Sequence, residues 1–252
     1  MDRPPATLLA REAWQLGFDA IRTMPRLFGG TFLVLLVFGT LFRWQHPPEK
    51  ELSLASALLG YASDIATEVI IVGAMIAVYR YALLREVRDR PVWDLPPNYD
   101  RVLAWTLLLN LPMLPGIAMI GLANAPGAAS AVLVLPAVVA LGVAVVILVR
   151  LTAFLAILAA DAPGAEWRKV WAMSRGHVWR FIVAGLLTFL PLYVAGYAAS
   201  KLIEGVGGPG AFLAETALGA AQALLLGAIG AAMWSRLVQV YGAVLLRPAG
   251  PW

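Results

Sequence analysis

The sequence predicts an all-α fold, a polytopic membrane helical bundle of six transmembrane helices arranged as three hairpins. Six apolar stretches of about 20 to 35 residues fill most of the 252-residue chain, and about 20 helical residues suffice to cross a hydrocarbon core. Hydrophobic residues make up 61% of the chain and charged residues 13%, whereas soluble domains carry roughly 25% charged residues. Basic residues collect in every second gap between the apolar stretches, as in multi-pass membrane proteins.

Residues 1–25 are expected to form an amphipathic helix that lies on the membrane surface. Apolar residues recur at spacings of three and four over residues 6–24, which is typical of a helix with one apolar face. Arg11 and Arg22 occupy the other face, and Trp14 suits the headgroup boundary. The first apolar stretch begins only near Leu27 and is not followed by a small-residue cleavage pattern, so no removable signal peptide is expected.

The second predicted unit is a transmembrane domain over residues 26–246, followed by a tail at 247–252. The crossings are expected at about 26–43, 52–88, 102–123, 128–160, 181–203 and 211–246. Short loops or turns are expected at 44–51, 124–127 and 204–210, an irregular connection at 89–101, and a basic, tryptophan-rich amphipathic segment at 161–180. The second crossing is too long for an upright span, so part of it tilts or projects.

A weak internal repeat favours the arrangement as three hairpins. A basic, aromatic or proline-bearing segment precedes each pair of crossings, at residues 6–26, 89–101 and 161–180. Each pair of crossings is then expected to run out and back across the membrane.

The orientation follows from the distribution of lysine and arginine. Of the 19 such residues, 16 fall toward the side of the chain ends and three, Arg43, Lys50 and Lys201, toward the other. Without Arg80, Arg150 and Arg236, which lie within predicted helices, the count is 13 against three. The positive-inside rule therefore predicts a bacterial inner-membrane protein with both termini in the cytoplasm. The net charge of +4 reflects this orientation, and no nucleic-acid partner is expected.

The sequence contains no motif for catalysis, a metal or a cofactor. It has no cysteine, which excludes disulfides and cysteine nucleophiles. Its two histidines, His46 and His177, lie in connections expected on opposite sides of the membrane. No phosphate-binding glycine-rich loop or nucleophile elbow occurs. We therefore expect a protein that is not an enzyme and that carries no metal or cofactor.

Six polar or charged residues in the apolar stretches are candidate functional residues, because such groups are costly in hydrocarbon. They are Asp64, Glu68, Arg80, Asn110, Arg150 and Arg236. Asp64 and Glu68 share one helix face and could bind a cation or relay protons. The favoured alternative places both at the periplasmic interface, because the uninterrupted apolar run starts only at Val69.

The three arginines of this set admit two interpretations. Arg150 could hold an anionic headgroup or pair with a carboxylate, or its side chain could reach the inner interface and anchor the helix. The same alternatives apply to Arg80 and Arg236, with interfacial anchoring favoured.

Prolines interrupt the third crossing near its middle. Pro112 and Pro115 free the carbonyls of Leu108 and Leu111. Broken helices form substrate sites in some transporters, but a structural kink is the favoured interpretation. Asn110, beside the break, keeps a site possible.

Small residues recur every four positions in the sixth crossing, at Gly219, Ala223, Gly227 and Ala231. This spacing allows two helices to approach closely. The partner is another helix of this chain or a second protein.

The stretch from 147 to 187 resembles the membrane domain attached to some bacterial glycerophosphoryl diester phosphodiesterases, and related six-helix bacterial membrane proteins. The matching positions are Arg150, Asp161, Trp171, Gly176 and Trp179, whereas Val170 stands where a serine is usual. The phosphodiesterase catalytic domain is absent. The resemblance implies a six-helix membrane domain that acts as an anchor, scaffold or lipid-facing module.

The sequence thus favours a non-enzymatic integral membrane protein, an accessory or assembly subunit of a larger complex or a lipid-associated scaffold. The alternative is a transporter or ABC-type permease subunit for a small or lipid-like substrate. Residues expected to contact anionic lipid headgroups or a protein partner are Arg11, Trp14, Arg22, Arg168, Trp171, Arg175 and Trp179.

Overall fold

The computed structural model describes residues 4–46, 53–124, 130–162, 165–206 and 209–246. Within these ranges the chain is helical and contains no strand, which confirms the all-α class. The elements are α1 (Ala6–Thr23), α2 (Pro25–Gln45), α3 (Leu54–Leu84), α4 (Tyr99–Asn110), the 3₁₀ turn η1 (Leu111–Met113), α5 (Leu114–Ala123), α6 (Ser130–Ala159), α7 (Trp167–Met173), α8 (Val178–Val206), α9 (Pro209–Tyr241) and the 3₁₀ turn η2 (Ala243–Leu246). The predicted tail 247–252, and parts of the predicted loops 44–51, 124–127 and 204–210, lie outside the described residues.

Six helical segments of this structure are long and apolar enough to cross a membrane: α2, α3, α4 with α5, α6, α8 and α9. They coincide with the six predicted crossings, and the chain is a multi-pass membrane protein. The second span ends earlier than expected, at Leu84, because Arg85 adopts a left-handed backbone conformation with φ of 59°. The irregular connection therefore begins at Arg85 and extends to the start of α4.

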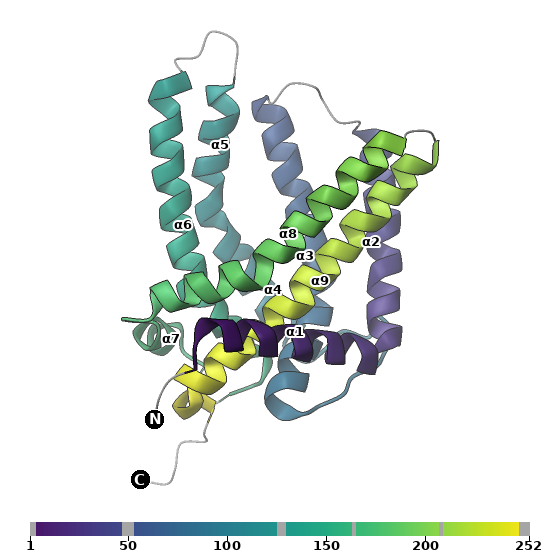
Figure 1. Ribbon diagram of the computed structural model, residues 1–252. Helices are drawn as coiled ribbons and strands as arrows, with labels where there is room; N and C mark the ends of the chain where they lie inside the picture. Colours follow the sequence, from purple (N-terminus) through teal and green to yellow (C-terminus); the bar gives the residue numbers. More distant parts are fainter. Residues whose placement is uncertain (1–3, 47–52, 125–129, 163–164, 207–208, 247–252) are drawn as a thin grey trace.

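The spans diverge from one end of the bundle (Figure 1). Helices α8 and α9 pack side by side and run obliquely, while α5 and α6 pack as a second hairpin. Helix α2 contacts both α3 and α9. The short helices α1 and α7 lie near the end of the bundle at which the N-terminal and C-terminal parts of the chain meet (Figure 1).

Helix α9 is the centre of the packing. It contacts α1, α2, α3, α6 and α8, and its residues 227–235 are all buried. A helix covered on every side must be apolar all round and must satisfy its own polar groups. Ser235 does so by donating a hydrogen bond to the carbonyl of Ala231 (2.8 Å).

Helix α1 has the predicted apolar face, but protein covers it. Leu9, Ala13 and Ala20 are buried, and α8 and α9 supply the covering surface. The expected location on the membrane surface therefore changes in one respect: this face of the helix packs on two spans rather than on lipid. Arg11 and Arg22 are exposed on the outer face, as expected.

The crossing of α1 over α9 is unusually close at Gly17. A Cβ atom on Gly17 would lie 2.8 Å from Cγ1 and 3.0 Å from Cα of Ile229. Trp14, one turn earlier, donates from Nε1 to the carbonyl of Thr188 in α8 (3.2 Å). Trp14 therefore fixes α1 to a span through this hydrogen bond.

The connection from Arg85 to Asn98 is held by charge. Asp89 accepts hydrogen bonds from the backbone nitrogens of Arg26 (2.7 Å) and Leu27 (3.3 Å), in the first turn of α2, where a carboxylate complements the positive helix end. Asp94 accepts from Arg90 (2.9 Å) and Arg88 (3.0 Å). The hydrogen bond from Arg90, together with the charges of both arginines, holds the pKa of the Asp94 carboxyl below its usual value.

The opposite end of the bundle carries few basic groups among the described residues. Arg43 pairs with Glu215 (2.9 Å) and Lys201 with Glu204 (2.6 Å). The charge asymmetry of the sequence is therefore an asymmetry between the two ends of the folded bundle.

Replacing Gly17 with alanine should destabilise the bundle, because the added methyl group must displace α1 from the backbone of Ile229. We expect the free energy of unfolding in detergent to fall by about 1–3 kcal/mol, the usual cost of overpacking. The matched control is Gly29→Ala in α2, where a Cβ meets nothing within 4 Å. Equal unfolding midpoints for the two variants would show that α1 does not pack closely on α9.

Candidate functional site: an intramembrane cavity

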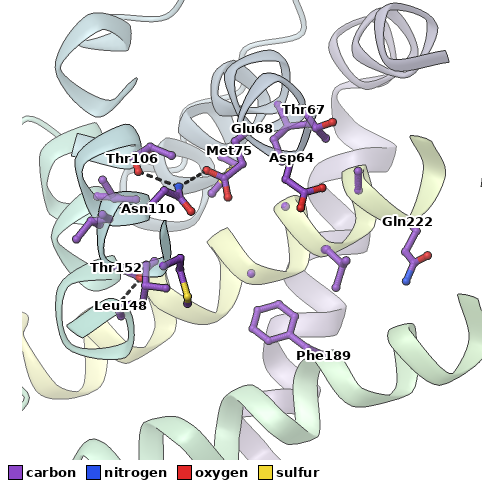
Figure 2. A pocket seen from close by; sticks show the side chains of 18 of the residues that line it. Asp64, Thr67, Glu68, Met75, Thr106, Asn110, Leu148, Thr152, Phe189 and Gln222 are labelled. Atoms are coloured by element: carbon purple, nitrogen blue, oxygen red, sulfur yellow. Dashed lines mark hydrogen bonds between the residues drawn. The ribbon is translucent and has the colours of Figure 1, made fainter. Parts of the chain in front are cut away.

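A cavity of about 770 Å³ lies among the spans α3, α4–α5, α6, α8 and α9. Its size is in the range of pockets that bind small organic molecules. Most of its wall is apolar, but one part is polar (Figure 2). The polar and aromatic residues that line it include Tyr61, Asp64, Thr67, Glu68, Thr106, Asn110, Thr152, Phe189, Tyr193, Gln222 and Trp234.

Asp64 and Glu68 lie inside the span formed by α3. At 1.5 Å per residue they are about 15 Å and 21 Å along the helix from Leu54, and α3 is continuous from Leu54 to Leu84. The extra length of this helix lies toward Leu84, because Gly73 is already level with Tyr99 at the start of α4. Both carboxylates line the cavity, Asp64 as an exposed residue and Glu68 as a half-buried one; their depth in the membrane stays a prediction.

Glu68 is held by the residue that precedes the helix break. Asn110 donates from Nδ2 to Oε2 of Glu68 and to the carbonyl of Thr106 (3.0 Å). These bonds orient the Glu68 carboxylate toward the cavity (Figure 2). The sequence identified Glu68 and Asn110 separately, and only the fold brings them together.

The break itself is stabilised from the neighbouring helix. Helix α4 ends at Asn110 and passes through the 3₁₀ turn into α5. Tyr61 of α3 donates its hydroxyl hydrogen to the carbonyl of Asn110 (2.7 Å), and the carbonyl of Leu111 accepts from the backbone nitrogen of Leu114. Within a bilayer such carbonyls need internal partners. The kink is therefore a built part of the cavity wall, and the externally satisfied carbonyl is that of Asn110 rather than that of Leu108.

The small-residue stripe of α9 serves in helix packing and in the cavity wall. Gly227 packs against Ile71 of α3, to which an added Cβ would lie 3.2 Å away, and Ala231 is fully buried. Gly219, Ala223 and Gly227 all line the cavity, and a Cβ on Gly219 would meet nothing within 4 Å. Part of the stripe thus packs on a helix of the same chain, and part of it leaves space.

Gln222 and Phe189 complete the opposite wall. Gln222 projects from α9 beside Gly196 of α8, and Phe189 projects from α8 beside Gly230 of α9. Sequence reasoning missed both residues, and also Tyr61. The available signal was Gln222, an amide in the middle of an otherwise apolar helix; the aromatic residues resemble ordinary core residues.

The three candidate arginines lie outside the cavity lining. Arg150 donates to Oγ of Ser174 (2.9 Å) and to the carbonyl of Trp171 (2.8 Å), and its guanidinium carbon lies 3.7 Å from the centroid of the Trp171 ring. Its described protein partners are therefore in and beside α7, and no described carboxylate pairs with it. Arg150 fastens α7 to α6.

Arg80 and Arg236 also join elements at the basic end of the bundle. Arg80 pairs with Glu86 (2.7 Å) and with Asp161 (3.0 Å), so it links α3 to the end of α6. Arg236 of α9 pairs with Glu12 of α1 (2.7 Å). Each arginine has a protein partner, which makes a structural role sufficient for both.

The residues expected to contact lipid or a partner separate into exposed and internal ones. Arg11, Arg22, Arg168, Arg175 and Trp179 are exposed. Trp14 and Trp171 are half-buried and engaged with other elements, as described above. Of the exposed residues, Arg168, Arg175 and Trp179 form a basic surface with one aromatic side chain on and beside α7.

Among the described residues there is no group of three or more histidine, cysteine, aspartate and glutamate side chains that could hold a metal ion. The donor set in the cavity, two carboxylates and two amides, instead suits hydrogen bonding and charge pairing with an organic group.

Comparison with protein-family models, curated proteins and solved structures yields no match for this chain. The six spans and the cavity define the class of protein: a multi-pass α-helical membrane protein with a cavity among its spans that is largely apolar and has one polar region.

Arg150→Gln should loosen α7 from α6, because glutamine does not reproduce the guanidinium contacts with Ser174 and Trp171. We expect the free energy of unfolding to fall by about 1–2 kcal/mol and protease cleavage near α7 to accelerate. Arg168→Gln, at an exposed position of the same segment, should change neither quantity measurably. If both variants behave like the wild type, Arg150 does not secure α7.

Proposed function

We propose that this chain is a non-enzymatic integral protein of the bacterial inner membrane that binds a lipid-like molecule inside its helical bundle. The observation that carries the proposal is the cavity of about 770 Å³ with a largely apolar wall and one polar region. A site of this composition suits an amphiphile, whose tail and head have opposite preferences. The proposal agrees with the lipid-facing module implied by the family resemblance.

The surroundings of the cavity favour a ligand that comes from the membrane. Met113, Ile117 and Leu148 line it, so a hydrocarbon tail finds apolar contacts. The outer faces of the flanking helices are covered by exposed apolar side chains, such as Val138 of α6 and Leu186 of α8. Such faces suit lipid tails, and a molecule dissolved in the bilayer has a short path to the site.

A second part of the proposal concerns the surface around α7. Arg168, Arg175 and Trp179 are exposed there, a composition that suits anionic headgroups or an acidic surface of a partner protein. A role as an accessory or assembly subunit of a larger membrane complex would use this surface, while the cavity holds the lipid-like molecule.

Transport is the second candidate function, and the break between α4 and α5 favours it. The break adjoins Asn110 in the cavity wall, and interrupted helices at a binding site can move in alternating-access transporters. Release of a bound molecule on the far side of a proteoliposome would distinguish a transporter from a static binding protein.

Filling the cavity should expel its ligand. We expect the wild type purified in mild detergent to retain a near-stoichiometric amphiphile, detected by native mass spectrometry, and Gly219→Phe to retain little of it. Gly219 lines the cavity with open space around it, so the ring can enter without a backbone clash. Gly142→Phe on α6, also with nothing within 4 Å but outside the lining, is the control. Equal retention in both variants, or none in the wild type, would contradict the proposed function.

The orientation can be measured directly because the chain has no cysteine. Trp93 is 79% exposed in the connection before α4, and Val206 is 86% exposed at the opposite end of the bundle. A membrane-impermeant maleimide should label Val206→Cys in intact spheroplasts, and Trp93→Cys only after permeabilisation. The reverse pattern would place the basic end, and with it both termini, outside the cytoplasm.

A further inference from the structure

We propose that the cavity selects an amphiphile whose head carries a positive charge, a primary or quaternary ammonium group, held at Asp64 and Glu68 of α3. This inference rests on the proposed function and adds the chemical class of the bound molecule. It is carried by the charge of the lining, by the unpartnered polar groups and by the aromatic residues around them.

The described lining residues carry two acidic groups and no lysine, arginine or histidine. The two carboxylates are one helical turn apart, a spacing at which like charges repel. Charges inside a bundle are costly unless they are paired. Arg80, Arg150 and Arg236 lie outside the cavity lining and are engaged with other residues of the protein. A cationic head is therefore the complement that this cavity lacks.

The polar groups of the cavity are only partly used within the described part of the chain. Glu68 accepts a hydrogen bond from Asn110, which orients it. Asp64 and Gln222 have no hydrogen bond or ion pair with any described residue. In Figure 2 Asp64 and Glu68 project from α3 with Phe189 of α8 across the hollow, whereas Gln222 projects from the other side of α9, against Gly196 of α8. An ammonium head in this space would be bound by the carboxylates of α3 and by the ring of Phe189.

Aromatic side chains are a second, independent indication of a cation. Tyr61, Phe189, Tyr193 and Trp234 line the same cavity. The faces of aromatic rings attract ammonium groups, and quaternary ammonium ligands are commonly held among several rings. The same rings give no preference to an anionic head, which the two carboxylates would repel.

The size of the cavity favours an organic cation over a metal ion. A volume of about 770 Å³ far exceeds what a single ion needs, and hard divalent ions require about six oxygen ligands at close range. Met113, Ile117 and Leu148 provide the apolar continuation of the site. A head joined to a hydrocarbon tail fills both regions.

The test uses the purified wild type in maltoside micelles and equilibrium dialysis against labelled probes with one tail length. The probes are tetradecyltrimethylammonium, tetradecyl maltoside and tetradecyl sulfate, with tetramethylammonium as the head without a tail; empty micelles give the background. We expect the cationic amphiphile to bind at least about tenfold more tightly than the neutral or anionic one, a factor that one well-placed charge interaction supplies. Tetramethylammonium should bind much more weakly than the cationic amphiphile, because it lacks the tail. Equal binding of the two would mean that the site takes a soluble ammonium ion and does not select an amphiphile.

Asp64→Asn and Glu68→Gln should each weaken binding of the cationic amphiphile by about tenfold and leave the neutral one unchanged. Glu204→Gln removes an acidic charge that pairs with Lys201 outside the cavity, and it should change neither affinity. If a carboxylate variant fails to fold, the relative affinities of the probes for the wild type still test the charge selectivity.

The outcomes separate the two proposals. Equal affinities for the cationic and neutral probes would overturn the charge selectivity, and so would cationic binding that Asp64→Asn and Glu68→Gln leave unchanged. The proposed lipid binding would still stand in either case, provided that Gly219→Phe abolishes the binding of the probes. If Gly219→Phe affects no probe, both the selectivity and the cavity as a binding site are wrong.

Discussion

Close packing around α9 is the constraint on which the rest of the bundle depends. Helices within a bilayer gain little from burying apolar surface, so they associate through contact between well-fitting surfaces. Phe189 of α8 packs against Gly230 of α9, Ile71 of α3 packs against Gly227, and Ile229 packs against Gly17 of α1. Small residues on several faces thus allow several helices to meet α9 at one level. Farther along α9 the neighbouring helices diverge, and the same small residues border a hollow.

The helix break and the cavity form one structural unit. Asn110 ends α4, orients Glu68 through its side chain and receives Tyr61 at its carbonyl. One residue therefore satisfies the interrupted backbone and positions an acidic group toward the hollow. These contacts explain how a proline-rich interruption is tolerated in a span.

The charged groups of the chain serve two separate purposes. At the basic end, Arg80, Arg150 and Arg236 each connect two elements and hold α1 and α7 against the spans. In the cavity, Asp64 and Glu68 face a space that contains no described cationic side chain. The first set has its partners within the protein. The second set has no cationic partner among the described residues that line the cavity, and this contrast is the basis of the proposed binding role.

The sequence by itself determined the six spans, the charge asymmetry of the two ends and the shared face of Asp64 and Glu68, because hydropathy, charge position and helical spacing are local properties. It also marked Asn110 beside the break. The pairing of Asn110 with Glu68, and that of Arg150 with Ser174, appear only in the folded structure. Such pairings join helices far apart along the chain, and they depend on crossing angles and close approaches that side-chain packing sets. Span length and amphipathicity carry no information about them, so the cavity became visible only once the helices were assembled.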